Sequence, residues 1–366
     1  MRAAGAALLA LTVAACATPK YEPQPGPRPG VPPFPRPGRP ESPRPEPTKP
    51  PLRVLELSEL PGWAADNHAE AFAAYRATCQ AAQGPAFARL CRQAKAAPPL
   101  GSREARAFFE ANFRALETAG EGVLTAYFAP EYPARAVADE VFSAPVRPKP
   151  ADLVNGQPYA ARDEIEARPA DDALAWMRPE DLFFLQIQGS GVLTFEDGRR
   201  MKALYAANNG LPFVGIANPM RERGLLARDN TSGEAIRGWL AAHAGPEADE
   251  IMRLNPRYAF FRLAPDDGRQ PAGSAGIPLP PGRAIAVDLT RHSHGELHWI
   301  SAEAPMLAGA FPTYRRLVTA LDTGGAIKGE VRADLYLGLG AEAGTEAGRV
   351  RHTLRMYRLI PREPGP

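Results

Sequence analysis

Residues 321–340 read LDTGGAIKGEVRADLYLGLG and carry two aspartates, one lysine and five glycines. Asp322 stands directly before the turn sequence Thr323-Gly324-Gly325, where small residues let backbone N–H groups and a carboxylate approach a ligand closely. Lys328-Gly329 predicts a second turn, and the residues after it predict a short strand that carries Asp334. Asp334 is therefore the candidate catalytic acid of this stretch.

Two other interpretations fit parts of the same stretch. Glycines that flank a carboxylate in a short strand also describe a hairpin with an exposed aspartate, and spacing alone leaves this alternative open. The run Gly338-x-Gly340-x-x-x-Gly344 invites comparison with dinucleotide-binding loops. Its spacing is wrong for such a loop and no βαβ unit surrounds it, so a dinucleotide site is disfavoured.

Longer motifs give this region a family resemblance. DTGGAIKG at 322–329, followed by R-x-D-L and preceded by Ala286-Val287-Asp288, resembles the three-aspartate domain of the MltA family of lytic murein transglycosylases. Four further stretches resemble the family in the same order: LTAYFAP at 124–130, DLFFLQIQGSG at 181–191, YAANNG at 205–210 and NPRYAFFR at 255–262. Together the matches extend from about residue 100 to residue 360.

The chain departs from the family at a few positions. The family usually has glycine where Ala126 stands and a polar residue where Ala129 stands. After Asp288 it usually has a Pro-Leu-Gly turn, where this chain has His294-Gly295 nearby. These differences concern the substrate cleft and leave the three aspartates in place.

The resemblance implies a mainly β fold with N-terminal helices, in which a double-psi β-barrel domain is interrupted by an inserted second β-barrel domain. On this chain, residues 52–130 and 259–366 would form the catalytic double-psi domain with its helices, and residues 131–258 the inserted glycan-binding domain. Glycan strands of peptidoglycan would lie in the groove between the two barrels. We expect a monomer.

The resemblance also implies a peptidoglycan lytic transglycosylase, a carbon–oxygen lyase of cell-wall turnover. Such an enzyme cleaves the β-1,4 bond between N-acetylmuramic acid (MurNAc) and N-acetylglucosamine (GlcNAc) without water and forms 1,6-anhydromuramyl products. Hydrolysis ordinarily takes two carboxylates, whereas attack by the 6-hydroxyl of the substrate needs one acid/base. We expect Asp334 to fill that role, with support from Asp322, Asp288 and Lys328, and with a pKa raised by burial or a neighbouring carboxylate. A non-catalytic peptidoglycan-binding lipoprotein and a hydrolytic muramidase are the alternatives.

Residues 181–195, DLFFLQIQGSGVLTF, predict a strand, a turn at Gly189-Ser190-Gly191 and a returning strand, with a further hairpin at Asp197-Gly198. Alternation places Gln186 and Gln188 on one face, where amides beside an aromatic ring suit a sugar. A solvated strand face explains the same pattern. With the family motifs, the candidate substrate-binding residues are Tyr127, Gln186, Gln188, Gly189, Ser190, Gly191, Tyr205, Asn209, Gly324 and Gly325.

Three helices are predicted before the first long strand at 122–130. The first carries Cys79 and the second Cys91, and an oxidising location after export favours a disulfide between them over two buried thiols. Ser102 predicts the cap of the third helix. The apolar stripe expected along that helix consists of Ala105, Phe108, Phe109, Phe113 and Leu116.

Residues 1–15 predict a cleaved export signal, because one basic residue precedes an apolar stretch too short to span a bilayer and a small-residue site. Cys16 ends a sequence that resembles a bacterial lipobox, so we expect acyl chains there to anchor the protein on the periplasmic face of the outer membrane. An ordinary signal peptide with an incidental cysteine is the alternative. Residues 16–51 predict an extended linker, since residues 19–51 hold 15 of the 41 prolines.

Charge and motifs exclude several other functions. A net charge of +2 gives no field that would favour a nucleic acid partner. His292-x-His294 with His298 has spacing that suits zinc, but no fourth ligand is obvious nearby and the family resemblance implies no metal. No P-loop or Gly-x-Ser-x-Gly elbow occurs. The sequence therefore predicts no metal and no cofactor.

Overall fold

The computed structural model describes residues 53–227, 230–304 and 311–363. The expected export signal, the lipidated Cys16 and the proline-rich linker lie outside the described residues. Among the described helices, none combines the length and apolarity that a membrane crossing requires.

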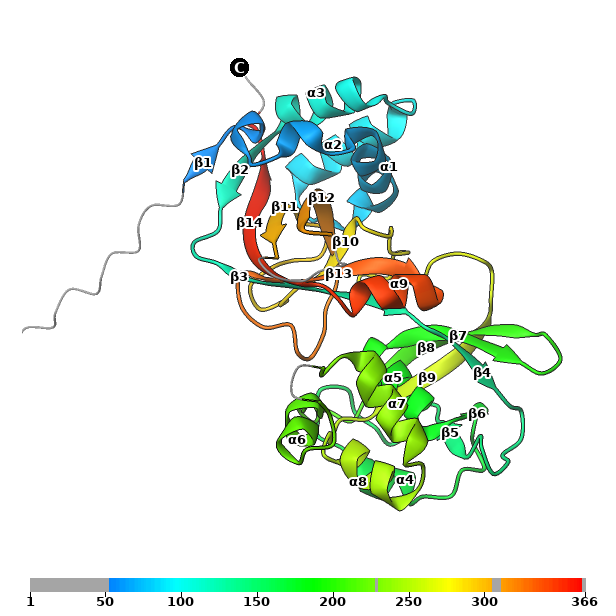
Figure 1. The fold of residues 1–366 in the computed structure, drawn as a ribbon. Coiled ribbons are helices and arrows are strands. Elements are labelled where there is room, and N and C mark those ends of the chain that lie inside the picture. Colours follow the sequence, from blue (N-terminus) through cyan, green and yellow to red (C-terminus); the bar gives the residue numbers. More distant parts are fainter. Residues whose placement is uncertain (1–52, 228–229, 305–310, 364–366) are drawn as a thin grey trace, which may run out of the picture. The chain divides into compact units, whose positions relative to one another are not determined.

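An eight-stranded sheet contains a closed ring of six strands (Figure 1). The ring closes because β14 pairs with both β11 and β3, while the order β11-β12-β10-β13-β3 completes the circle. Two pairings within the ring are parallel, β10 with β12 and β13 with β3. The strands are β1 (Val54–Leu55), β2 (Phe113–Glu117), β3 (Gly122–Ala129), β10 (Ala284–Ala286), β11 (Leu297–Glu303), β12 (Thr313–Asp322), β13 (Arg332–Leu339) and β14 (Arg351–Pro361), and helix α9 (Gly340–Ala347) joins the last two.

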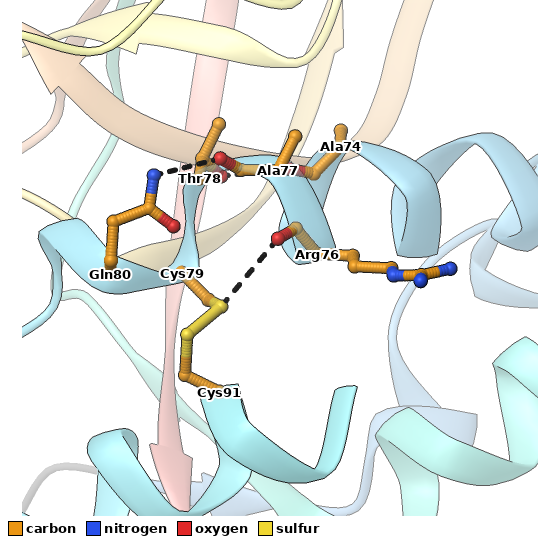
Figure 2. The surroundings of a disulfide bond; sticks show 7 residues. All are labelled: Ala74, Arg76, Ala77, Thr78, Cys79, Gln80 and Cys91. Atoms are coloured by element: carbon orange, nitrogen blue, oxygen red, sulfur yellow. Dashed lines mark hydrogen bonds between the residues drawn. A yellow bond between two sulfur atoms is a disulfide. The ribbon is translucent and has the colours of Figure 1, made fainter. Parts of the chain in front are cut away.

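Helices α1 (His68–Thr78), α2 (Pro85–Ala96) and α3 (Ser102–Asn112) pack on one side of this sheet. Aromatic side chains at helical spacing, such as Phe72 and Phe109, form their core with Trp299 of β11. Cys79 and Cys91 are joined by a disulfide, with 5.3 Å between their Cα atoms (Figure 2). This is the pairing favoured from the sequence.

The prediction for the third helix was wrong at both ends. Gly101 is the N-cap, and Ser102 is already helical. Phe113 and Leu116 belong to β2, because the helix ends at Asn112 and the chain continues as a strand paired with β14. Pairing of β2 with β14 therefore replaces the last expected helical turn.

Residues 131–265 contribute a four-stranded sheet, a two-stranded sheet and five helices. The larger sheet has the order β4-β7-β8-β9, and its β7–β8 hairpin turns at Asp197-Gly198 as predicted. The strands are β4 (Glu131–Ala134), β7 (Ser190–Phe195), β8 (Arg200–Asn208) and β9 (Ala259–Pro265), with β5 (Ala144–Val146) paired to β6 (Ala175–Met177). The helices are α4 (Arg162–Glu166), α5 (Pro179–Gln188), α6 (Ala217–Glu222), α7 (Gly233–Ala242) and α8 (Pro246–Arg253).

Helix α5 contradicts the strand predicted for the start of the DLFFLQIQGSG motif. Pro179 occupies the first turn, acidic residues follow it, and Gly189 ends the helix in the left-handed conformation with φ 83°. These are start and stop signals of a helix. Leu182 and Leu185 are buried on one face at helical spacing. Gln186 and Gln188 therefore project from the end of a helix and not from a strand.

Candidate active site

Strand register brings two of the three aspartates together. Asp334 in β13 lies opposite Thr125 of β3 on one side and Ala286 of β10 on the other. Asp322, the last residue of β12, lies opposite the same Ala286. The central position of β10 therefore places Asp322 and Asp334 near each other, although they belong to strands that do not pair directly.

Both carboxylates line one cavity of about 210 Å³. Its wall combines carboxylates, amides, guanidinium groups and aromatic rings, which are the groups that bind sugars through hydroxyl hydrogen bonds and ring packing. The lining residues are Thr125, Ala126, Tyr127, Arg162, Gln186, Ile187, Gln188, Phe213, Asn255, Arg257, Ala259, Ala286, Asp322, Thr323, Gly325, Ala326 and Asp334.

Asp334 is held by a short chain of hydrogen bonds. The hydroxyl of Thr125 donates to Oδ1 of Asp334 and accepts a hydrogen bond of 2.9 Å from Nη2 of Arg332. Burial is the largest effect on the pKa of Asp334 and raises it, and the charge of Asp322 raises it further. The hydrogen bond from Thr125 and the charge of Arg332 lower it. The net result is a pKa above the usual value for aspartate. Asp334 therefore keeps a proton more readily than an ordinary aspartate, as a general acid requires.

Asp322 accepts three hydrogen bonds. Its Oδ1 accepts from the backbone N–H groups of Ser274 and Thr323, both at 2.9 Å, and its Oδ2 accepts from the hydroxyl of Tyr127 at 2.8 Å. Burial and the neighbouring charge of Asp322 raise the pKa of Tyr127 well above its usual value, so its hydroxyl stays a donor. Asp322 thus acts as a fixed acceptor with a defined orientation.

Asp288 has a different environment and does not line the cavity. Its Oδ2 accepts a 2.9 Å hydrogen bond from the backbone N–H of Gly329, and its Oδ1 accepts from the backbone and hydroxyl of Thr290. The Gly329 bond, followed by those from Thr290, lowers the pKa of Asp288 to about 2. Asp288 is therefore an ionised residue that holds the turn between β12 and β13.

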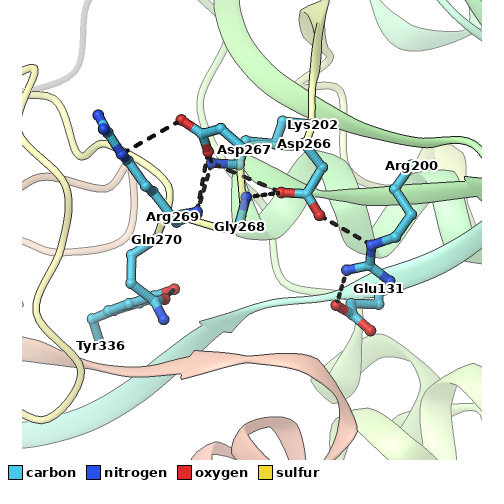
Figure 3. Close-up of polar contacts among 9 residues, drawn as sticks. All are labelled: Glu131, Arg200, Lys202, Asp266, Asp267, Gly268, Arg269, Gln270 and Tyr336. Carbon is cyan, nitrogen blue, oxygen red and sulfur yellow. Dashed lines mark hydrogen bonds and ion pairs between the residues drawn. The ribbon is translucent and has the colours of Figure 1, made fainter.

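Ion pairs within residues 131–269 and one hydrogen bond to Tyr336 of the barrel form a connected set of polar contacts (Figure 3). Arg200 of β8 pairs with Glu131 at 2.7 Å and with Asp266 at 3.0 Å. Four residues after Asp266, Gln270 accepts a 2.7 Å hydrogen bond from the hydroxyl of Tyr336. The ring of Tyr336 in turn packs on Tyr127, with 5.2 Å between the ring centroids. The loop after β9 is thus tied to the side chain that orients Asp322.

Comparison with known proteins agrees with this geometry. The family model described as the MltA specific insert domain matches residues 123–262, and the 3D domain model matches residues 283–360. Membrane-bound lytic murein transglycosylase A of Vibrio cholerae is 35% identical over 251 residues, which cover 66% of this chain and 66% of that protein. The crystal structure of a membrane-bound lytic murein transglycosylase from Agrobacterium tumefaciens is 32% identical, with a TM-score of 0.73, and the match covers 84% of this chain and 97% of that one.

The chain belongs to the MltA family of lytic murein transglycosylases. Escherichia coli MltA with bound chitohexaose, another similar structure, has a TM-score of 0.68 at 27% identity, with 86% of this chain and 95% of that chain covered. The expected fold class, a double-psi barrel with an insert, is thereby confirmed.

Several residues expected at the MltA substrate site lie away from the cavity. Asn209 is buried and holds backbone, since its amide donates to the carbonyls of Ala160 and Pro256. Lys328 is exposed on the turn beside Asp288. The others outside the cavity wall are Gly189, Ser190, Gly191, Tyr205 and Gly324.

The cavity wall also includes two arginines that the sequence did not predict. Arg257 donates to the carbonyl of Leu211 at 3.0 Å, and none of the described carboxylates lies within ion-pair distance of it. Arg162 is buried and donates to the carbonyls of Asn255 and Arg257, which fixes that segment. The NPRYAFFR motif contains Arg257, but nothing in the motif itself indicates that this side chain faces the cavity.

Proposed function

We propose that this chain is a lytic transglycosylase that cleaves the MurNAc–GlcNAc bond of peptidoglycan, with Asp334 as its single acid and base. The observation that carries the proposal is that one cavity holds Asp334, whose pKa is raised, and Asp322, which three hydrogen bonds fix in place. The family relationship and the sugar oligomer bound by the related Escherichia coli structure support a glycan substrate.

In the first step, protonated Asp334 donates its proton to the glycosidic oxygen as the bond to C1 of MurNAc breaks. Positive charge then develops on the sugar ring. The fixed negative charge of Asp322 stabilises it, since Asp322 is oriented by three hydrogen bonds and lies against the same cavity.

In the second step, the 6-hydroxyl of MurNAc attacks C1 and passes its proton to the Asp334 carboxylate. The new C1–O6 bond closes the 1,6-anhydro ring, and Asp334 returns to its protonated form. A hydrolase needs a second carboxylate free to activate water or attack C1. Asp322 is a poor candidate because three hydrogen bonds to its oxygens hold the carboxylate in place and weaken it as a base.

The glycan is proposed to contact the polar side of the cavity. Gln186 has a buried amide whose two polar atoms form no hydrogen bond with the described residues, so a sugar hydroxyl or acetamido group would satisfy them. Gln188 is held by the backbone N–H of Phe128 at 3.4 Å. The guanidinium of Arg257 offers further donors, and Phe213 offers a ring face.

The finer assignments of location and domains belong to the same proposal. Relatives of this chain are named membrane-bound, and we infer that acyl chains on Cys16 supply the attachment on the periplasmic face of the outer membrane, with the protein acting as a monomer. We also place the catalytic double-psi domain at residues 52–130 and 259–366 and the inserted domain at 131–258. The family models, matched at 123–262 and 283–360, support this division.

Digestion of purified sacculi tests the function directly. Mass spectrometry of the released muropeptides is expected to find anhydro ends, which are lighter by one water than reducing ends. Reducing ends would instead identify a muramidase, and sacculi that are bound but not cleaved would identify a binding protein.

A further inference from the structure

Three side chains between residues 292 and 298 form a cluster that the proposed reaction does not use. His292 follows Asp288 in the chain, Glu296 lies in the next turn, and His298 is in β11. One ligand atom from each of them lies within 4.8 Å of the other two. We propose that this cluster binds a zinc ion.

The distances fit a metal better than they fit hydrogen bonds. Oε2 of Glu296 is 3.4 Å from Nδ1 of His292 and 3.3 Å from Nε2 of His298. N–H···O hydrogen bonds usually measure about 2.7–3.2 Å, and charge-assisted bonds are shorter still. Ligand atoms bound to one tetrahedral zinc at about 2.0–2.1 Å are separated by about 3.3–3.4 Å.

The orientation of the His292 ring points in the same direction. Nε2 of His292 lies 2.9 Å from the carbonyl oxygen of Glu330, which can only accept, so Nε2 carries the proton. Nδ1, the nitrogen on the other side of the ring, faces the Glu296 carboxylate at 3.4 Å. A backbone carbonyl on the opposite nitrogen is the usual support of a metal-binding histidine.

Burial and the second oxygen of Glu296 complete the site. The side chain of His298 is fully buried. Its Nδ1 has no hydrogen-bond partner among the described residues, and its Nε2 has only the Glu296 carboxylate at 3.3 Å. A buried imidazole with so few polar partners is costly unless it has a ligand. Arg358 lies 3.5 Å from Oε1 of Glu296, which leaves Oε2 directed at the two histidines.

Two histidines and a glutamate with an open fourth position form a known zinc donor set. The sequence pattern had suggested His294 as a ligand, but its Nε2 lies 2.8 Å from the hydroxyl of Ser274 instead. Glu296 takes its place in the cluster. Through Glu330, the ion would brace the turn whose Gly329 holds Asp288.

Metal binding is measured on the full chain without a histidine tag. After dialysis against chelator and then zinc chloride, we expect one zinc per chain by elemental analysis. Cobalt chloride is expected to give the strong visible absorption of a tetrahedral site, which zinc then abolishes. The unfolding midpoint is expected to rise with zinc.

Matched variants locate the site. Glu296→Gln and His298→Gln are expected to lose both zinc uptake and the cobalt spectrum, whereas His294→Gln keeps both. Glu296 is partly exposed, and a circular dichroism spectrum equal to that of the parent in chelator separates loss of the site from loss of the fold. No zinc uptake by the parent chain, or uptake that folded Glu296→Gln retains, overturns the proposal. Neither result bears on transglycosylation, because no substrate is present.

Discussion

Replacement of Thr125 by valine tests how the environment of Asp334 sets its pKa. The Thr125 hydroxyl donates a hydrogen bond to Asp334, and this bond lowers the pKa of the carboxyl group. Valine keeps the shape of the side chain and removes the hydroxyl. A hydrogen bond to a charged group contributes about 1.5–3 kcal/mol, and one pKa unit corresponds to about 1.36 kcal/mol. The pKa of Asp334 should therefore rise by about 1–2 units.

The pH dependence of kcat/KM on soluble glycan substrate reports this shift. Asp334 must be protonated to begin the reaction, so activity falls as pH rises through its pKa. In Thr125→Val the falling limb should move about 1–2 units to higher pH. Thr319→Val is the matched control, because Thr319 is a buried threonine of β12 with no hydrogen bond to Asp334. A limb that stays in place, or moves to lower pH, would refute the assignment.

Three further changes probe other parts of the structure. Asp322→Asn removes a charge that raises the pKa of Asp334, so the falling limb of the kcat/KM profile should move to lower pH. The same variant should lower kcat about 10²-fold. An unchanged pH profile would contradict this role of Asp322. Gln186→Leu should raise KM about tenfold with little change in kcat. Steady-state kinetics on chitooligosaccharide or muropeptide chains measure both constants. A loss in kcat with no change in KM would contradict a binding role for Gln186. Cys79→Ser with Cys91→Ser opens a loop with a sequence separation of 12 and should lower the free energy of unfolding by about 3 kcal/mol in urea titrations, with no effect expected on the pH profile.

The sequence predicted the chemistry of this site better than its geometry. The DTGGAIKG and R-x-D-L motifs identified Asp322 and Asp334, and the structure places both on one cavity. Asp288, in the motif Ala286-Val287-Asp288, is also an aspartate of the family pattern. Its carboxylate accepts a hydrogen bond from the backbone of Gly329 and does not line the cavity. Nothing in the pattern distinguishes a carboxylate that faces a cavity from one that caps a turn, because strand register decides between them.

Helix α5 shows a second limit of pattern reasoning. The apolar residues of DLFFLQIQ fit two patterns, the alternation of a strand and one face of a helix. The flanking residues resolve the ambiguity, since Pro179 begins the helix and Gly189 ends it. Arg257 reaches the cavity only because Arg162, nearly a hundred residues away, fixes its segment. Such long-range contacts leave no local signal.

Replacement of Asp334 by asparagine is the most direct test of the single acid/base. Burial raises the pKa of Asp334, so its ionised form opposes folding above the pKa of the unfolded chain, and the Asp334→Asn variant should be at least as stable as the parent at neutral pH. Its rate of release of 1,6-anhydromuropeptides from sacculi should fall at least about 10³-fold. A folded variant that releases these products within about tenfold of the parent rate would show that another group moves the proton.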